Sequence, residues 1–128
     1  MERYLLDTHV AIWLFRDDQK LSERSKRIFC NISNSIYISI ASIWELAIKI
    51  SIGKMSFNGK IPKFVELAED NNITILPIET SYLPILDILP SIHRDPFDRI
   101  LIATAMAERM TLISADENIA RYNVPLVW

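Results

Sequence analysis

Short apolar runs alternate with segments of helical spacing along almost the whole 128-residue chain. Strands that alternate with helices predict βαβ units, which build a parallel sheet with helices on both faces. Because such crossovers are right-handed, we expect a three-layer α/β/α sandwich around a central, mainly parallel sheet. The predicted strands are 3–7, 36–39, 73–76, 111–114 and 126–128.

The segments between these runs have the apolar spacing of helices. One of them, about 40–52, is followed by Gly53-Lys54, a typical helix end. A chain of this length is most simply one domain, so residues 1–128 are expected to fold as a single unit. The predicted helices are 8–16, about 21–31, about 40–52, Pro62 to about Asn71, 80–89, 96–109 and 116–121.

The composition excludes several classes of site. Two glycines, Gly53 and Gly59, are too few for a glycine-rich phosphate loop. The single cysteine, Cys30, excludes an internal disulfide, and with two histidines no Cys/His zinc cluster can form. Cys30 lies in an apolar helical pattern and is expected in the core. We also expect a cytoplasmic protein without a membrane segment, because no run approaches transmembrane length and the N-terminus lacks signal-peptide architecture.

Charge and apolar content bear on the partners. The formal net charge is -2, so tight, purely electrostatic binding of nucleic acid is not expected. Metal bound to several acids would leave the rest of the chain mildly positive, so a nucleic-acid substrate is not excluded. Half of the residues are apolar, which favours a dimer or a protein partner that covers part of the surface.

Four carboxylates each follow a predicted strand or lie early in the next helix. In open α/β sheets, ligands bind in the crevice outside the carboxyl ends of the strands. Acids gathered there repel one another unless cations lie between them. Carboxylate oxygens suit Mg²⁺ or Mn²⁺, so the pattern predicts a divalent-metal site and phosphodiester chemistry. The four candidates are Asp7, Glu45, Asp98 and Asp116.

Each acid near a helix start also has a structural interpretation. Asp7 can cap the helix that follows it. Ser114 and Glu117 have capping-box spacing, which would place Asp116 in the first turn. Asp95 precedes a proline, as a cap residue does. These alternatives stay open for single residues, but four such junctions exceed what capping demands.

Glu45 is harder to explain by capping. It shares one stripe with Ser42 and Lys49 on a helix that is otherwise apolar and therefore largely buried. A glutamate there needs either a polar cavity or a charged partner. Lys49, one turn on, is that partner in the structural alternative.

Four segments resemble the successive motifs of the PIN-domain nucleases, and in particular the toxins of bacterial VapBC-type toxin–antitoxin pairs. Their order and spacing span nearly the whole chain. The resemblance implies a metal-dependent endonuclease acting on RNA, a homodimer, and a small antitoxin whose C-terminal part covers the site. The segments are Leu5-Leu6-Asp7-Thr8-His9, Ser42-Ile43-Trp44-Glu45, His93-Arg94-Asp95-Pro96-Phe97-Asp98-Arg99 and Ile113-Ser114-Ala115-Asp116.

Carried over by motif, the metal-binding acids are again Asp7, Glu45, Asp98 and Asp116. Asp95 belongs to the same motif as Asp98. The resemblance further implies that Ser114 holds a ligand or a water. Many relatives carry a basic residue at the position of Ala115, so this chain lacks one phosphate contact.

The remaining polar residues have weaker assignments. Lys49 and Arg99 are candidates to hold phosphate, although Arg99 points about 100° away from Asp98 on an ideal helix. His93 is expected to shape the loop before that helix. Two alternatives remain, a Mg²⁺-dependent phosphatase or phospho-acceptor domain and a catalytically silent binding module. Thr8-His9 after Asp7 disfavours the phosphatase, which typically carries Asp-x-Asp.

Overall fold

The computed structural model of the protein describes residues 2–128 and contains the predicted alternation of strands and helices. The strands are β1 (Arg3–Leu6), β2 (Ser35–Ser39), β3 (Ile73–Leu76), β4 (Thr111–Ile113) and β5 (Leu126–Val127). The helices are α1 (Thr8–Arg16), α2 (Glu23–Cys30), α3 (Ile40–Ser51), α4 (Lys60–Asp70), the 3-10 turn η1 (Thr80–Tyr82), α5 (Leu83–Ile88), α6 (Pro96–Glu108) and α7 (Glu117–Ala120).

All strand pairs are parallel, and the order across the sheet is β3-β2-β1-β4-β5. The first strand therefore lies in the middle, with Leu6 opposite Ile38 of β2 on one side and Ile113 of β4 on the other. The chain leaves β1 towards β2 and later returns to the opposite side at β4. Such a switch point opens a crevice at the carboxyl ends of the strands.

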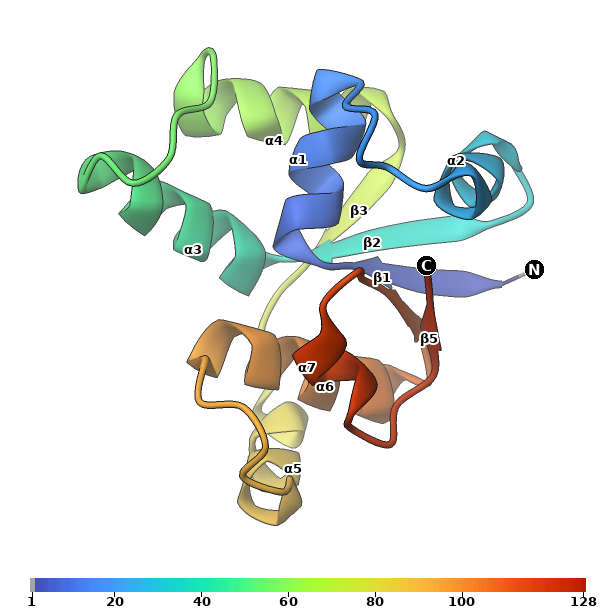
Figure 1. Ribbon diagram of the computed structural model, residues 1–128, viewed down its shortest axis with the longest axis vertical. Coiled ribbons are helices and arrows are strands. Elements are labelled where there is room, and N and C mark those ends of the chain that lie inside the picture. Colours follow the sequence, from blue (N-terminus) through green and yellow to red (C-terminus); the bar gives the residue numbers. More distant parts are fainter. Residues whose placement is uncertain (1) are drawn as a thin grey trace.

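Helices cover both faces of the sheet, as the sequence predicted (Figure 1). Leu6 belongs to a buried cluster with residues of α1, α3 and α4, whereas its neighbour Leu5 belongs to a cluster with residues of α6 and α7. Consecutive strand residues point to opposite faces, so both must be apolar in a sheet covered twice. Each fully buried leucine contributes about 1.5–3 kcal/mol.

Two predicted helices differ in detail. The helix predicted to begin at Pro62 begins at Lys60, because a proline in the first turn removes no helical hydrogen bond. The predicted helix 80–89 is divided into η1 and α5, with Pro84 at the start of α5. Within residues 2–128, no helix is long and apolar enough to cross a membrane.

The core prediction for Cys30 is wrong, because its side chain is exposed at the end of α2. This helix is short and strongly one-sided: Ile28 and Phe29 pack against the core, and Cys30 faces away. The sequence pattern Ile28-Phe29-Cys30 could not show where the apolar stripe ended.

Candidate metal and active site

The four predicted acids come from separate elements and lie at the carboxyl edge of the sheet. Asp7 directly follows β1 and Asp116 lies shortly after β4, while Glu45 and Asp98 lie in α3 and in the first turn of α6. Asp7, Glu45 and Asp98 are at most 8% exposed. Burying three carboxylates at one edge of the sheet destabilises the folded protein unless each has a hydrogen-bond or charged partner.

Ser114 connects two of the acids. Its hydroxyl donates a hydrogen bond to Asp7 Oδ2 over 2.6 Å and accepts one from the backbone N–H of Asp116 over 3.0 Å. Ser114 itself is buried at the end of β4. The serine thus holds Asp7 in one orientation and fixes the backbone that carries Asp116.

Glu45 is held by two partners. Thr8 donates its hydroxyl to Glu45 Oε1 over 2.9 Å, and Lys49 Nζ lies 2.9 Å from Oε2. Both carboxylate oxygens are therefore engaged, and the ion pair that the sequence left open is formed. Thr8 was not singled out from the sequence, because nothing there shows that the start of α1 meets α3.

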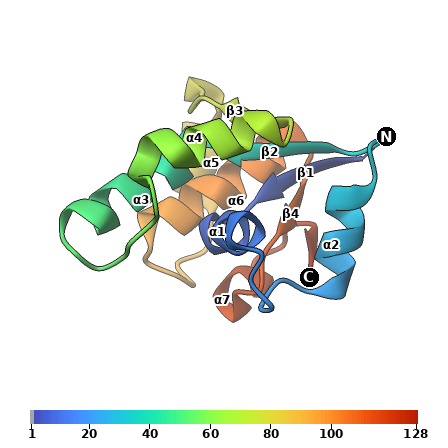
Figure 2. The same ribbon diagram turned by 90° about the horizontal axis from the view of Figure 1, so that it is seen from above.

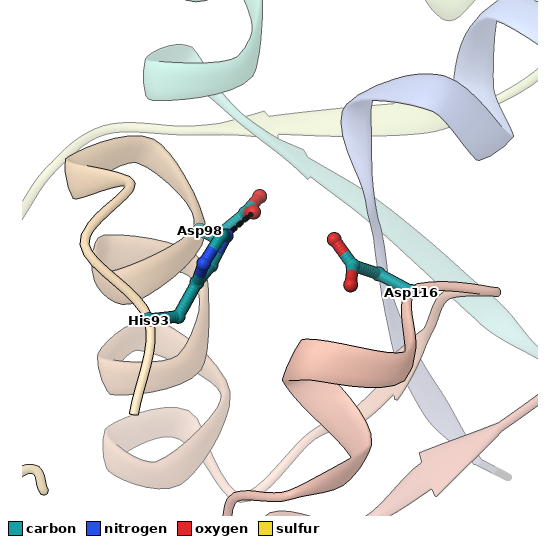
Figure 3. Close-up of side chains that lie close together, drawn as sticks. All are labelled: His93, Asp98 and Asp116. Atoms are coloured by element: carbon teal, nitrogen blue, oxygen red, sulfur yellow. Dashed lines mark hydrogen bonds and ion pairs between the residues drawn. The ribbon is translucent and has the colours of Figure 1, made fainter. Parts of the chain in front are cut away.

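His93 is more than a loop residue. Its Nε2 lies 2.8 Å from Asp98 Oδ2, and both side chains point towards Asp116 across a gap (Figure 3). One atom from each of His93, Asp98 and Asp116 lies within 4.8 Å of the others, a spacing that a single metal ion can bridge. The sequence signal that could have assigned His93 to the site is that it stands in the same motif segment as Asp98.

The charges of neighbouring acids contribute to shifts in the pKa values of Asp98 and Asp7. Burial, with the charges of Asp7 and Asp95, raises the pKa of Asp98 to about 7, and the hydrogen bond with His93 offsets only part of this. Burial also raises the pKa of Asp7 above its ordinary value, against the opposing effects of Ser114 and His9. The folded protein therefore resists full ionisation of these carboxylates near neutral pH.

Lys49 brings a positive charge to the acids through its ion pair with Glu45. Burial opposes its charge, but the Glu45 hydrogen bond and the charges of Glu45, Asp95 and Asp98 outweigh it and raise the pKa of Lys49 above its ordinary value. The lysine side chain is 31% exposed, so it neutralises Glu45 without closing the crevice.

The residues present fit a divalent metal. Carboxylate oxygens and one imidazole are suitable donors, and a cation would relieve the repulsion that raises the pKa of Asp98. Ser42, on the same stripe of α3 as Glu45, is 1% exposed, and its hydroxyl has no hydrogen-bond partner among residues 2–128. An unpartnered buried hydroxyl beside acids is typical of a hydrated site.

The capping alternatives are correct for some residues. Asp95 is the N-cap of α6, accepting from the N–H groups of Phe97 and Asp98. Asp7 caps α1 over a long 3.4 Å bond, so capping uses one oxygen and Ser114 the other. The predicted capping box is wrong: Asp116, not Ser114, is the N-cap of α7.

The guanidinium of Arg99 is engaged by partners within the protein. Its guanidinium donates hydrogen bonds to the carbonyls of Leu86 and Pro90 and to the hydroxyl of Tyr122. Adjacent helical residues point about 100° apart, so the Arg99 side chain leaves α6 in a different direction from that of Asp98. The arginine instead anchors the loop that carries His93.

Comparisons with known proteins agree with this geometry. The model of the PIN domain matches residues 4–125. VapBC2 from Rickettsia felis, solved bound to a DNA fragment from its promoter, is similar with a TM-score of 0.74 and 16% identity over 98% of this chain and 97% of that chain. FitAcB from Neisseria gonorrhoeae has a TM-score of 0.68 and 19% identity over 98% and 96% of the two chains.

A toxin–antitoxin complex from Klebsiella pneumoniae is similar at a TM-score of 0.63 and 18% identity, over 98% of this chain and 96% of that chain. No curated protein matches the chain. Identities this low show a shared fold, whereas the family match rests on the sequence itself and spans every strand except the last, β5. The chain therefore belongs to the PIN-domain family.

Proposed function

We propose that the protein is a metal-dependent endoribonuclease that hydrolyses RNA phosphodiester bonds. The observation that carries the proposal is the convergence of Asp7, Glu45, Asp98 and Asp116, from four elements, at one edge of the sheet, where burial and neighbouring charges raise the pKa values of Asp7 and Asp98. Such perturbed acids in a cleft favour a functional site over a structural network.

In this proposal the four acids hold one or two Mg²⁺ or Mn²⁺ ions. A bound ion would supply positive charge for the phosphate oxygens and lower the pKa of an attacking water. Ser114 orients Asp7, and Thr8 with Lys49 orients Glu45. His93 lies close enough to Asp98 and Asp116 to complete the donor set.

The purified protein is expected to cleave single-stranded RNA with Mg²⁺ or Mn²⁺ and to stop when EDTA is added. The physical reason is that four acids would otherwise repel the phosphate that they must hold. Labelled RNA on a denaturing gel measures this, with p-nitrophenyl phosphate as the control substrate. Cleavage undiminished by excess EDTA would contradict the site, and hydrolysis of the phosphomonoester alone would favour the phosphatase class.

We also propose a homodimer, supported by an apolar surface next to the site. Trp44 and Leu83 are 59% and 47% exposed, and Trp44 packs edge-on against Phe97 at a centroid distance of 5.2 Å. They line a cavity of about 220 Å³ whose walls are almost wholly apolar. Apolar surface exposed to water does not stabilise a monomer, whereas a second copy of this chain would bury the surface. The cavity lining is Ala41, Trp44, Ile78, Leu83, Pro96, Phe97 and Ile100.

Replacing Trp44 by arginine is expected to convert the dimer to monomer, because the charge would be buried without a partner. Sedimentation velocity measures the change. Ile32→Arg is the matched control, since Ile32 is 100% exposed and lies outside this apolar surface. A wild-type protein that is monomeric at high micromolar concentration, or a dimeric Trp44→Arg variant, would remove this surface as the interface.

Finally, we propose that the protein is the toxin of a toxin–antitoxin pair. The support is the fold shared with chains from toxin–antitoxin assemblies, including VapBC-1 from Haemophilus influenzae. The small antitoxin should be encoded by the neighbouring reading frame as a DNA-binding protein with a basic, apolar tail. Co-purification of the two chains and loss of RNA cleavage in the complex would test this partner.

A further inference from the structure

A cavity of about 200 Å³ adjoins the acids on the side of α1. Its walls are Asp7, His9, Trp13, Ala115 and Asp116. Two of these residues belong to the proposed metal site, and the others contribute two rings and a methyl group. The volume is below the ~300–1,000 Å³ of a pocket for a drug-sized ligand, so it suits a single planar group.

The His9 and Trp13 rings that line this cavity belong to a row of aromatic rings that ends at Trp128. The His9 and Trp13 ring centroids are 6.2 Å apart, and those of Trp13 and Trp128 are 5.6 Å apart. His9 and Trp13 are one helical turn apart on α1, so they share a face. The ring of the C-terminal residue Trp128 packs against that of Trp13 at a tilt of 55°. The cavity lies where α1 and the segment of α7 come close to each other (Figure 2). The row therefore holds Trp13 in a fixed position.

The two sides of the cavity differ in chemistry. Asp7 and Asp116 belong to the proposed metal site, so a phosphate bound through the metal would lie on their side, and the rings of His9 and Trp13 remain for a planar group. Lys20 Nζ lies 6.0 Å from the centre of the Trp13 ring and is exposed, so a cation lies near the ring. A neutral planar ring fits beside the rings of His9 and Trp13. A phosphate attached next to that ring would then lie at the metal site.

Ala115 keeps this cavity open. It is exposed between Ser114 and Asp116 and contributes only a methyl group to the lining. A long side chain at this position would occupy the space in front of Trp13. The small residue and the supported ring together leave a slot next to Asp7.

We propose that this cavity is a nucleobase subsite, in which a base next to the scissile phosphodiester stacks on Trp13 and contacts His9. The inference rests on the proposed ribonuclease function and adds the part of the substrate that this chain recognises. Stacking on an aromatic side chain tolerates any base and contributes strongly to single-strand binding. The ligand class is a single-stranded ribonucleotide segment with an unpaired base.

The test is a binding titration with two probes, a single-stranded hexaribonucleotide and the same oligomer without its bases. Ca²⁺ replaces Mg²⁺, and a gel checks that the oligomer stays intact. We expect quenching of tryptophan fluorescence by the first probe and at least tenfold weaker binding of the second. Trp13→Phe should lose most of the quenching but retain the affinity, because phenylalanine also stacks. Ile32→Ala, at a fully exposed position outside the cavity, should retain both.

A second variant avoids dependence on the packing of Trp13. Ala115→Leu fills the slot from an exposed position, so it should fold normally by circular dichroism and bind both probes equally. Equal affinity of the wild type for the two probes, or an undiminished base preference in Ala115→Leu, would overturn the subsite. RNA cleavage together with equal binding of the base-containing and base-free oligomers would refute the subsite and leave the proposed function standing. Tighter binding of the base-containing oligomer without cleavage in Mg²⁺ or Mn²⁺ would leave the subsite standing and refute the proposed function.

Discussion

Asp98→Asn is expected to abolish RNA cleavage and, at pH 8 without metal, to raise the melting temperature. The variant removes a charge that the folded protein holds at a cost, since the pKa of Asp98 is raised from 3.8 to about 7. Each unit of such a shift corresponds to about 1.4 kcal/mol. After relaxation of the surroundings we expect a gain on the order of 1–3 kcal/mol in the free energy of unfolding.

The sign of the pH dependence follows from the direction of this shift. Because the folded-state pKa is raised, the stabilising effect of protonated Asp98 is complete below about pH 4 and is lost as the pH rises to about 7. The wild type should therefore lose stability over this range relative to Asp98→Asn. Thermal melts of both proteins between pH 5 and 8 measure the difference, which should grow with pH.

Added Mg²⁺ or Mn²⁺ provides a second measurement. Metal that binds the folded state raises its stability, so the wild-type melting temperature should rise and that of Asp98→Asn should not. Asp95→Ala is the contrasting variant: it removes the N-cap of α6 and should cost about 0.5–2 kcal/mol at every pH. A drop in stability with cleavage retained in Asp98→Asn would show that Asp98 supports the helix dipole and not the site.

Lys49→Met is expected to destabilise the metal-free protein by about 1–3 kcal/mol, because it leaves the carboxylate of Glu45 with one partner fewer. The figure is below that of a fully buried pair, since the lysine side chain is 31% exposed. Chemical denaturation at pH 7 measures the loss. Lys63→Met is the control: its pair with Glu66 is exposed at 3.7 Å and should matter by less than about 1 kcal/mol.

A companion variant and a metal titration separate the two roles of Glu45. The double variant Lys49→Met with Glu45→Gln should recover much of the lost stability, because no charge is then unpaired. Saturating Mg²⁺ should also reduce the loss in Lys49→Met if Glu45 faces the metal. Glu45→Gln alone should fold and fail to cleave RNA. A fully active Glu45→Gln would leave a site of three acids.

The sequence by itself determined the layers and the edge of the sheet at which the acids gather. Leu5 and Leu6 are both apolar because both faces of β1 are covered, and this pattern already implied a parallel sheet. Asp7 follows β1 directly and Asp116 lies shortly after β4, so their shared edge was predictable. These are local properties: each depends on the order of residue types within one element and on the regular geometry of strands and helices.

Only the tertiary structure decided which side chains form hydrogen bonds with the acids. Thr8 reaches Glu45 and His93 reaches Asp98 because α1 packs on α3 and the loop before α6 folds back, which no local pattern reports. Arg99 was a candidate phosphate contact, and only the packing of α6 against α5 and the C-terminal segment shows that its guanidinium bonds Leu86 and Tyr122. Side-chain partners of this kind depend on contacts between distant segments, and those distances are fixed only when the helices pack on the sheet.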